Sequence, residues 1–79
     1  MIILKKEDFF LINVLKRDIF LKITERDTFL EKIKELDKDN RILEEFSSNF
    51  LEPVFSIYEY YSRPEFKDRV DNIIKYLNI

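Results

Sequence analysis

The chain has 79 residues with no cysteine, histidine or glycine, and its formal net charge is −2. This length fits a single compact domain, 1–79. Without cysteine and histidine the chain has no disulfide or thiolate metal site, and it lacks the side chain that most often serves as a general base. The absence of glycine excludes the loops that cradle phosphates, and the acidic balance argues against a protein that coats nucleic acid. We therefore expect no enzymatic activity, no metal ion and no cofactor.

Nothing in the sequence indicates a membrane segment or an export signal. The longest purely apolar run, residues 9–12, is far shorter than the roughly 20 residues that a membrane-spanning helix needs. The N-terminus lacks the ordered charged, apolar and small-residue regions of a signal peptide. We therefore expect a cytoplasmic protein. Its eight phenylalanines and four tyrosines can build its core, because each aromatic ring buries a large area.

Residues 2–24 are rich in apolar and β-branched side chains, and we predict that they form a small strand element. If residues 7–23 were a helix, their polar side chains would scatter around it and leave no clean apolar face. A period of two fits better, because apolar side chains alternate along 19–23 and those at alternate positions of 10–14 share one side. Residues 16–18 would then form the turn. The alternative is an all-α four-helix bundle with a very apolar first helix.

The remainder of the chain has the apolar spacing of helices, and we predict three of them. The first covers about 25–38. The second covers about 41–61 and is kinked at Pro53, because proline removes a backbone hydrogen bond and clashes with the preceding turn. The alternative to a kink is two short helices that meet near Glu52. The third covers about 64–78. The predicted fold is therefore α+β and mostly helical, with the N-terminal strand element packed on three helices.

The second predicted helix carries the feature that points most directly to a function. No basic residue lies between Arg41 and Arg63, whereas four glutamates do. If the apolar stripe of this helix faces the core, helical geometry turns another set of residues toward solvent. That set consists of Glu45, Glu52, Glu59 and, approximately, Ser56 and Tyr60. Tyrosine is enriched in protein interfaces, and acidic charge steers a basic partner.

Our leading hypothesis is a non-enzymatic protein-binding module whose acidic, tyrosine-bearing helix face contacts a basic surface of another protein. Small acidic domains of this kind act as inhibitors, immunity proteins or accessory subunits, and phages and mobile elements encode many of them. The chain is also 46% hydrophobic, with eight phenylalanines and four tyrosines in 79 residues. Apolar surface left uncovered after folding, above all along 9–21, favours a homodimer.

The alternative function is a dimeric DNA-binding regulator. Residues 18–61 resemble the ribbon-helix-helix family in the order of their elements, which are an alternating strand, a helix, a turn and a longer helix. In that family the outward side chains of the strand read the major groove, and the resemblance assigns this role to Asp18, Phe20 and Lys22. The basic patch available for phosphate contacts consists of Lys16, Arg17 and Lys22.

Overall fold

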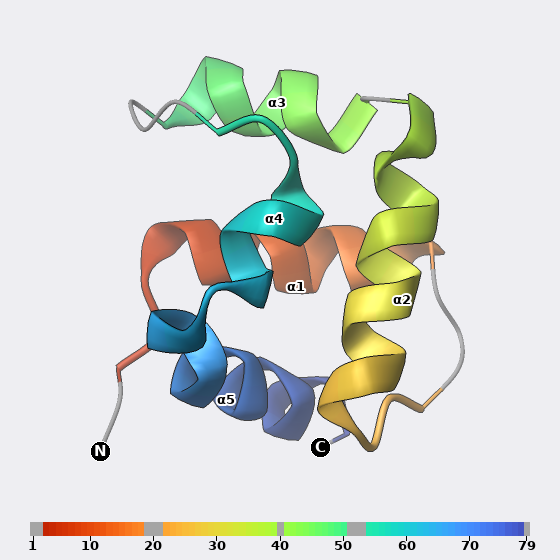
Figure 1. Cartoon of the computed structure of the whole chain (residues 1–79), viewed down its shortest axis with the longest axis vertical. Helices are drawn as coiled ribbons and strands as arrows, with labels where there is room; N and C mark the ends of the chain where they lie inside the picture. The colour runs from red at the N-terminus through yellow and green to blue at the C-terminus, as the bar shows by residue number, and fades with distance from the viewer. Residues whose placement is uncertain (1–2, 19–21, 40, 51–53, 79) are drawn as a thin grey trace.

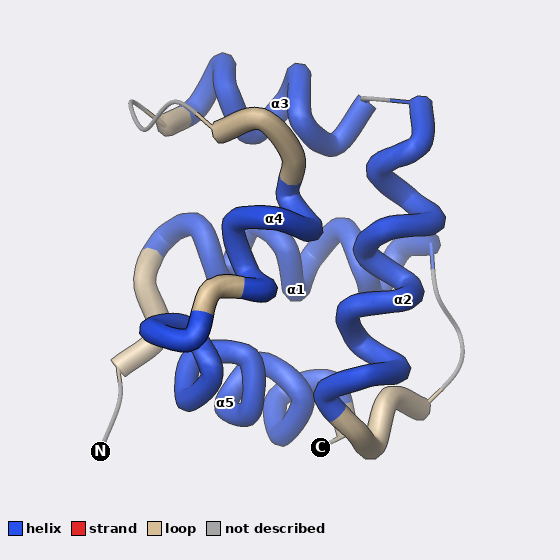
Figure 2. Tube along the Cα trace, viewed as in Figure 1, coloured by secondary structure: helices blue, strands red, loops and turns tan. Residues whose placement is uncertain are grey.

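The computed structural model describes residues 3–18, 22–39, 41–50 and 54–78. Within these ranges the chain forms five α-helices and two short 3-10 helices (Figures 1 and 2), namely α1 (Lys6–Asp18), α2 (Arg26–Leu36), η1 (Asp37–Asp39), α3 (Arg41–Asn49), α4 (Ile57–Ser62), η2 (Pro64–Phe66) and α5 (Lys67–Leu77). None of the described residues lies in a strand. Among them, no helix combines the length and the hydropathy that crossing a membrane requires.

The predicted N-terminal strand element over 2–24 is wrong, because most of this region is helix α1. The buried positions of α1 recur at helical spacing, and they are Asp8, Leu11, Ile12, Val14 and Leu15. Because Asp8 is an acid, the sequence pattern places it among the exposed residues. With Asp8 left out, the helical spacing of the buried face cannot be recognised. Residues 19–21 of the predicted strand lie outside the described residues, and residues 22–24 are not in a strand. The all-α alternative therefore has the correct class.

The three predicted helices are present with altered bounds. Together α2 and η1 cover 26–39, close to the predicted 25–38. The region predicted over 41–61 is divided into α3 and α4, in agreement with the alternative of two short helices. Their expected meeting point near Glu52 lies outside the described residues. Pro53, where we expected the kink, lies outside the described residues. The helix predicted over 64–78 consists of η2 followed by α5.

Helix α4 has its own beginning. Ser56, which precedes it, has an extended backbone, and its hydroxyl accepts a hydrogen bond from the N–H of Glu59 at 2.9 Å. This is the geometry of an N-cap, which satisfies one of the free N–H groups of a first helical turn. Because the helix restarts here, its orientation does not continue that of α3. Ile57, Tyr60 and Tyr61 face the core.

Aromatic rings from four helices meet in the hydrophobic core. Consecutive contacts run from Phe10 to Phe46, Tyr60, Tyr61 and Phe29, with centroid separations of 6.2, 5.5, 5.0 and 6.1 Å. These separations lie in the range that aromatic pairs prefer. The helices pack around the rings, with α1 against α5 and α3, and α2 against α4 and α5. The Cα radius of gyration, 11.5 Å, is close to the roughly 12 Å expected of a folded chain of this length.

A buried carboxylate connects the end of α2 to the start of α4. Asp37 is 8% exposed, and its Oδ2 accepts the backbone N–H of Ile57 at 3.1 Å. Its Oδ1 is also buried and accepts no hydrogen bond from a described residue. Burial raises the pKa of Asp37 above its usual value, and the hydrogen bond from Ile57 only partly opposes this effect. The carboxylate therefore positions α4 while its negative charge is poorly solvated.

We predict that the effect of Asp37→Asn on the stability of the folded chain is most favourable at neutral pH. The raised pKa means that the folded chain binds the Asp37 proton more tightly than the unfolded chain does. The stability contributed by Asp37 is therefore largest below about pH 4 and decreases as the pH rises through the raised pKa. Asparagine keeps an oxygen for the N–H of Ile57 but carries no charge. The melting temperature of the variant minus that of the wild type should therefore be larger at pH 7 than at pH 4.

Thermal unfolding followed by circular dichroism across this pH range measures the difference. Asp71→Asn, which removes an exposed carboxylate from α5, is the matched control. A difference for Asp37→Asn that grows toward acidic pH would contradict the assigned sign.

Candidate functional site

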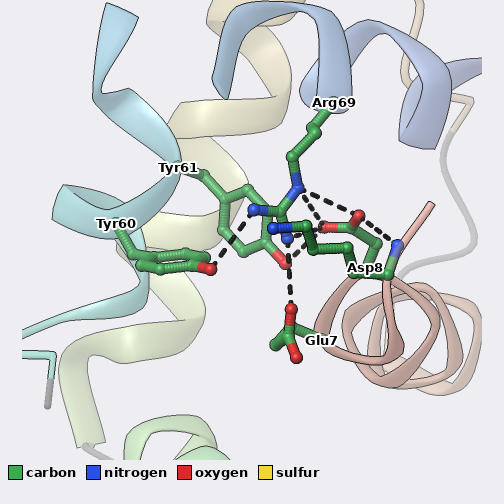
Figure 3. Close-up of polar contacts among 6 residues, drawn as sticks. Glu7, Asp8, Tyr60, Tyr61 and Arg69 are labelled. Carbon is green, nitrogen blue, oxygen red and sulfur yellow. Dashed lines mark hydrogen bonds and ion pairs between the residues drawn. The ribbon is translucent and has the colours of Figure 1, made fainter. Parts of the chain in front are cut away.

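A buried ion pair joins α1 to α5 (Figure 3). Asp8 is 0% exposed and Arg69 is 5% exposed. The guanidinium of Arg69 donates from Nη2 to Asp8 Oδ1 at 2.6 Å and from Nε to Asp8 Oδ2 at 3.0 Å. Such a two-pronged contact is the strongest form of arginine–carboxylate pairing. It links residues that are 61 positions apart in the sequence.

Asp8 also closes the beginning of its own helix. It is the third residue of α1, and its Oδ2 accepts the backbone N–H of Lys5 at 2.8 Å. A side chain at this position that reaches back to the capping residue forms one half of a capping box. The negative charge also lies at the positive end of the helix dipole. The same carboxylate therefore starts α1 and connects it to α5.

Two tyrosines from α4 complete the polar cluster (Figure 3). The hydroxyl of Tyr61 donates to Asp8 Oδ1 at 3.0 Å, and the hydroxyl of Tyr60 accepts from Arg69 Nη1 at 3.3 Å. The ring of Phe66 lies 4.6 Å from the central guanidinium carbon, at a distance that gives a cation–π interaction. Glu7 adds a second, weaker ion pair to Arg69 at 3.5 Å. The cluster therefore joins α1, α4 and α5.

Two members of this cluster, Tyr61 and Arg69, keep their protons around neutral pH. Burial and the adjacent Asp8 carboxylate raise the pKa of Tyr61, so its hydroxyl keeps its proton. Burial disfavours the charge of Arg69, but its hydrogen bonds to Asp8 and Tyr60 outweigh burial and leave its pKa raised. Neither group exchanges protons in the range that acid–base catalysis at neutral pH uses. The cluster is a structural connection between helices, and its central atoms are closed to a ligand.

The structure separates the residues of the predicted acidic face. Glu45 is exposed on α3, and Glu59 is exposed in the first turn of α4. Glu52 lies outside the described residues. The expectation that Tyr60 is exposed is wrong, because it is 3% exposed and stacks on Phe66 with a centroid separation of 4.7 Å. The predicted face placed Glu45 and Tyr60 by a single helical spacing across Pro53, and the restart of α4 turns Tyr60 inward.

The exposed aromatic residue of this segment is Phe55, which the sequence analysis did not single out. Its side chain is 90% exposed, and it directly precedes the cap of α4. A signal for this arrangement was present in the sequence. Ser56 and Glu59 have the spacing of a capping box, and Pro53 lies just upstream. Together these residues indicate a helix start at 57, and with it a non-helical Phe55.

The residues of the alternative basic patch are not on a strand. Lys16 and Arg17 are exposed in the last turn of α1, and Lys22 is exposed in the segment that precedes α2. Phe20 lies outside the described residues, and Asp18 is the last residue of α1. The strand on which the resemblance to the ribbon-helix-helix family depends covers 19–23. Residues 19–21 lie outside the described residues, and residues 22 and 23 are not in a strand.

Neither a metal site nor a relative indicates the function. Within the described ranges, no cluster of three or more acidic, histidine or cysteine side chains could hold a metal ion. No family model matches this sequence, and searches of curated proteins and of solved structures give no significant match. The function must therefore be inferred from the chemistry of the surface.

We predict that Asp8→Ala is strongly destabilising because it removes the main counter-ion of the buried Arg69 guanidinium and leaves only the longer ion pair with Glu7. Removing one partner of a buried ion pair costs about 3–5 kcal/mol. This is a large share of the roughly 5–15 kcal/mol by which native proteins are stable. Urea unfolding followed by circular dichroism measures the loss in the free energy of unfolding.

Two further variants complete this experiment. Asp8→Leu combined with Arg69→Met removes both charges, and it should recover part of the stability that Asp8→Ala loses. Asp71→Ala, at an exposed acid of the same helix as Arg69, should change the free energy of unfolding by no more than about 0.5 kcal/mol. An Asp8→Ala variant as stable as this control would refute the structural role of the ion pair.

Proposed function

We propose that this chain is a non-enzymatic protein-binding module that uses Phe55, with the glutamates on either side of it in the sequence, to contact a basic surface of another protein. The observation that carries the proposal is the 90% exposure of Phe55. Burying a phenylalanine side chain is worth about 1.5–3 kcal/mol, and this chain leaves that free energy available to a partner. An inhibitor, an immunity protein or an accessory subunit needs only a stable surface of this kind.

The backbone at Phe55 is held on both sides. Val54 is partly buried and packs against the hydrophobic core. On the other side, Ser56 is fixed by its capping hydrogen bond to the N–H of Glu59. Anchoring a contact residue before binding reduces the conformational entropy that binding costs. Phe55 is therefore well placed to be a central anchor residue of an interface.

Acidic side chains accompany Phe55. Glu59 lies four residues later and is exposed, and Glu44 and Glu45 are exposed on α3. The sequence places no positive charge between Arg41 and Arg63, and Lys34 of α2 lies over the ring of Tyr58, the residue before Glu59. A surface with charges of one sign attracts a partner of the opposite sign and increases the association rate. The expected partner therefore has lysine or arginine around an apolar depression that accepts Phe55.

We predict that the double variant Phe55→Ser/Glu59→Lys loses the partner without unfolding. Truncation of an anchor residue at the centre of an interface costs about 2 kcal/mol or more, which corresponds to roughly a thirtyfold weaker complex. Both side chains are exposed, so the free energy of unfolding should stay within about 0.5 kcal/mol of the wild type for each change. Tagged protein is used to capture partners from nuclease-treated lysate of the source cell or its host, followed by quantitative mass spectrometry.

The control is Tyr76→Ser, which truncates an aromatic side chain that is 44% exposed on α5. The proposal requires a basic protein that wild type and control retain and that the double variant loses. Equal capture by all three proteins would refute it. If DNA is captured instead, and only without nuclease, the DNA-binding alternative and its patch at Lys16, Arg17 and Lys22 would replace the proposal.

A further inference from the structure

We infer that α1 and α3 form the contact surface of a symmetric homodimer in which α1 of each protomer lies on α3 of the other. The inference does not involve Phe55 and needs no other protein, but it shares the α3 glutamates Glu44 and Glu45 with the proposed function. It depends on three observations, which are a groove between the two helices, exposed aromatic rings beside it, and the opposite charges of the helices.

The groove has a volume of about 450 Å³, and it is lined by Lys6, Phe9, Phe10, Asn13, Asn49 and Phe50. The first four residues lie on α1, Asn49 is the last residue of α3, and Phe50 follows it. The ring of Phe10 contacts that of Phe50 at a centroid separation of 5.7 Å. Aromatic rings therefore form an apolar wall of an open groove, with amide and ammonium groups beside them.

The apolar surface continues from this groove across α1 to α5. Phe9 lines the groove and is 44% exposed, and its ring packs edge-on against that of Tyr76 with centroids 5.7 Å apart. Tyr76 is exposed to the same extent. A continuous aromatic surface of this kind is typical of regions where proteins associate.

The two helices beside the groove carry opposite charges. On α1, the exposed charged side chains that the structure describes are those of Lys6, Lys16 and Arg17. Of the acids of this helix, Glu7 and Asp8 bind Arg69, and the side chain of Asp18 lies outside the described ones. On α3, the exposed charged side chains that the structure describes are those of Glu44 and Glu45. Among the described side chains, the surface is therefore basic on the α1 side of the groove and acidic on the α3 side.

This charge distribution selects the symmetry of the contact. A two-fold axis across α1 would place α1 against its own copy, and the basic side chains would repel one another. A two-fold axis along the groove places α1 of each protomer over α3 of the other. Each basic helix then meets an acidic one, and the α1–α3 contact forms twice in the dimer. A self-complementary surface of this kind generates a closed dimer. The aromatic rings of the groove then meet at the axis, where water is excluded.

The test is sedimentation equilibrium of the purified wild type and of charge variants across the micromolar range. Lys6→Glu and Glu45→Lys each replace two attractive contacts in the dimer with two repulsive ones. Each should raise the dimer dissociation constant on the order of tenfold. The double variant Lys6→Glu/Glu45→Lys exchanges the two charges and should restore most of the wild-type association. High salt should weaken the wild-type dimer, because these charges are exposed.

The substitutions are compatible with their helices. Lys6 is the first residue of α1, where a glutamate is favoured by the helix dipole. Lys67→Glu makes the same change at the first residue of α5, and Glu31→Lys reverses an exposed glutamate on α2. These two control variants should dimerise like the wild type. Circular dichroism confirms that every variant is folded.

A wild type that stays monomeric overturns the inference, and so does a double variant that associates no better than the single ones. Dimerisation that the groove variants do not change would place the contact elsewhere and also overturns it. The proposed function is tested separately. Phe55→Ser/Glu59→Lys should lose the other protein and keep the dimer, whereas Lys6→Glu should lose the dimer and keep the other protein.

Discussion

The buried pairing of Asp8 with Arg69 is the interaction on which the arrangement of the helices depends. It joins the first turn of α1 to the first turn of α5, and the hydroxyls of Tyr60 and Tyr61 bring α4 into the same cluster. Two ions removed from water are costly unless their hydrogen bonds are nearly complete. Here five hydrogen bonds converge on the Asp8 carboxylate, from Lys5, Tyr61 and Arg69. Such a requirement for complete pairing permits few alternative packings of these three helices.

A core fixed in this way leaves the exposed side chains to determine function. Phe55 is held in place by neighbours that are themselves anchored, and glutamates accompany it. The other exposed aromatic surface, at Phe9 and Tyr76, lies beside a helix whose exposed charges are positive. The two surfaces therefore differ in charge, and the partners that we propose for them differ accordingly. One is a basic protein, and the other is the acidic helix of a second copy.

The sequence predicted a helix correctly where apolar side chains alone show the helical spacing of its buried face, and incorrectly where a polar side chain is needed to complete that spacing. The helices near 25–38 and 64–78 were predicted well, because their apolar positions follow helical spacing on their own. The region 2–24 was predicted wrongly, because the buried face of α1 contains Asp8. In the candidate site, Glu45 and Glu59 were correctly expected to be exposed. Tyr60 was wrongly expected to be exposed, because its orientation follows from the restart of α4 at Ser56 and from packing on Phe66.

The sequence by itself determined the helical rhythm after residue 24, the supply of aromatic rings for a core, and the acidic stretch between Arg41 and Arg63. These are properties of composition and local spacing, so they do not require knowledge of distant contacts. Only the tertiary structure decided that Asp8 is buried, that Tyr60 faces inward and that Phe55 faces solvent. The physical reason is the same for the two buried residues. A polar group enters a core only where a partner satisfies it, and for both of them that partner is Arg69, which is remote in the sequence from Asp8.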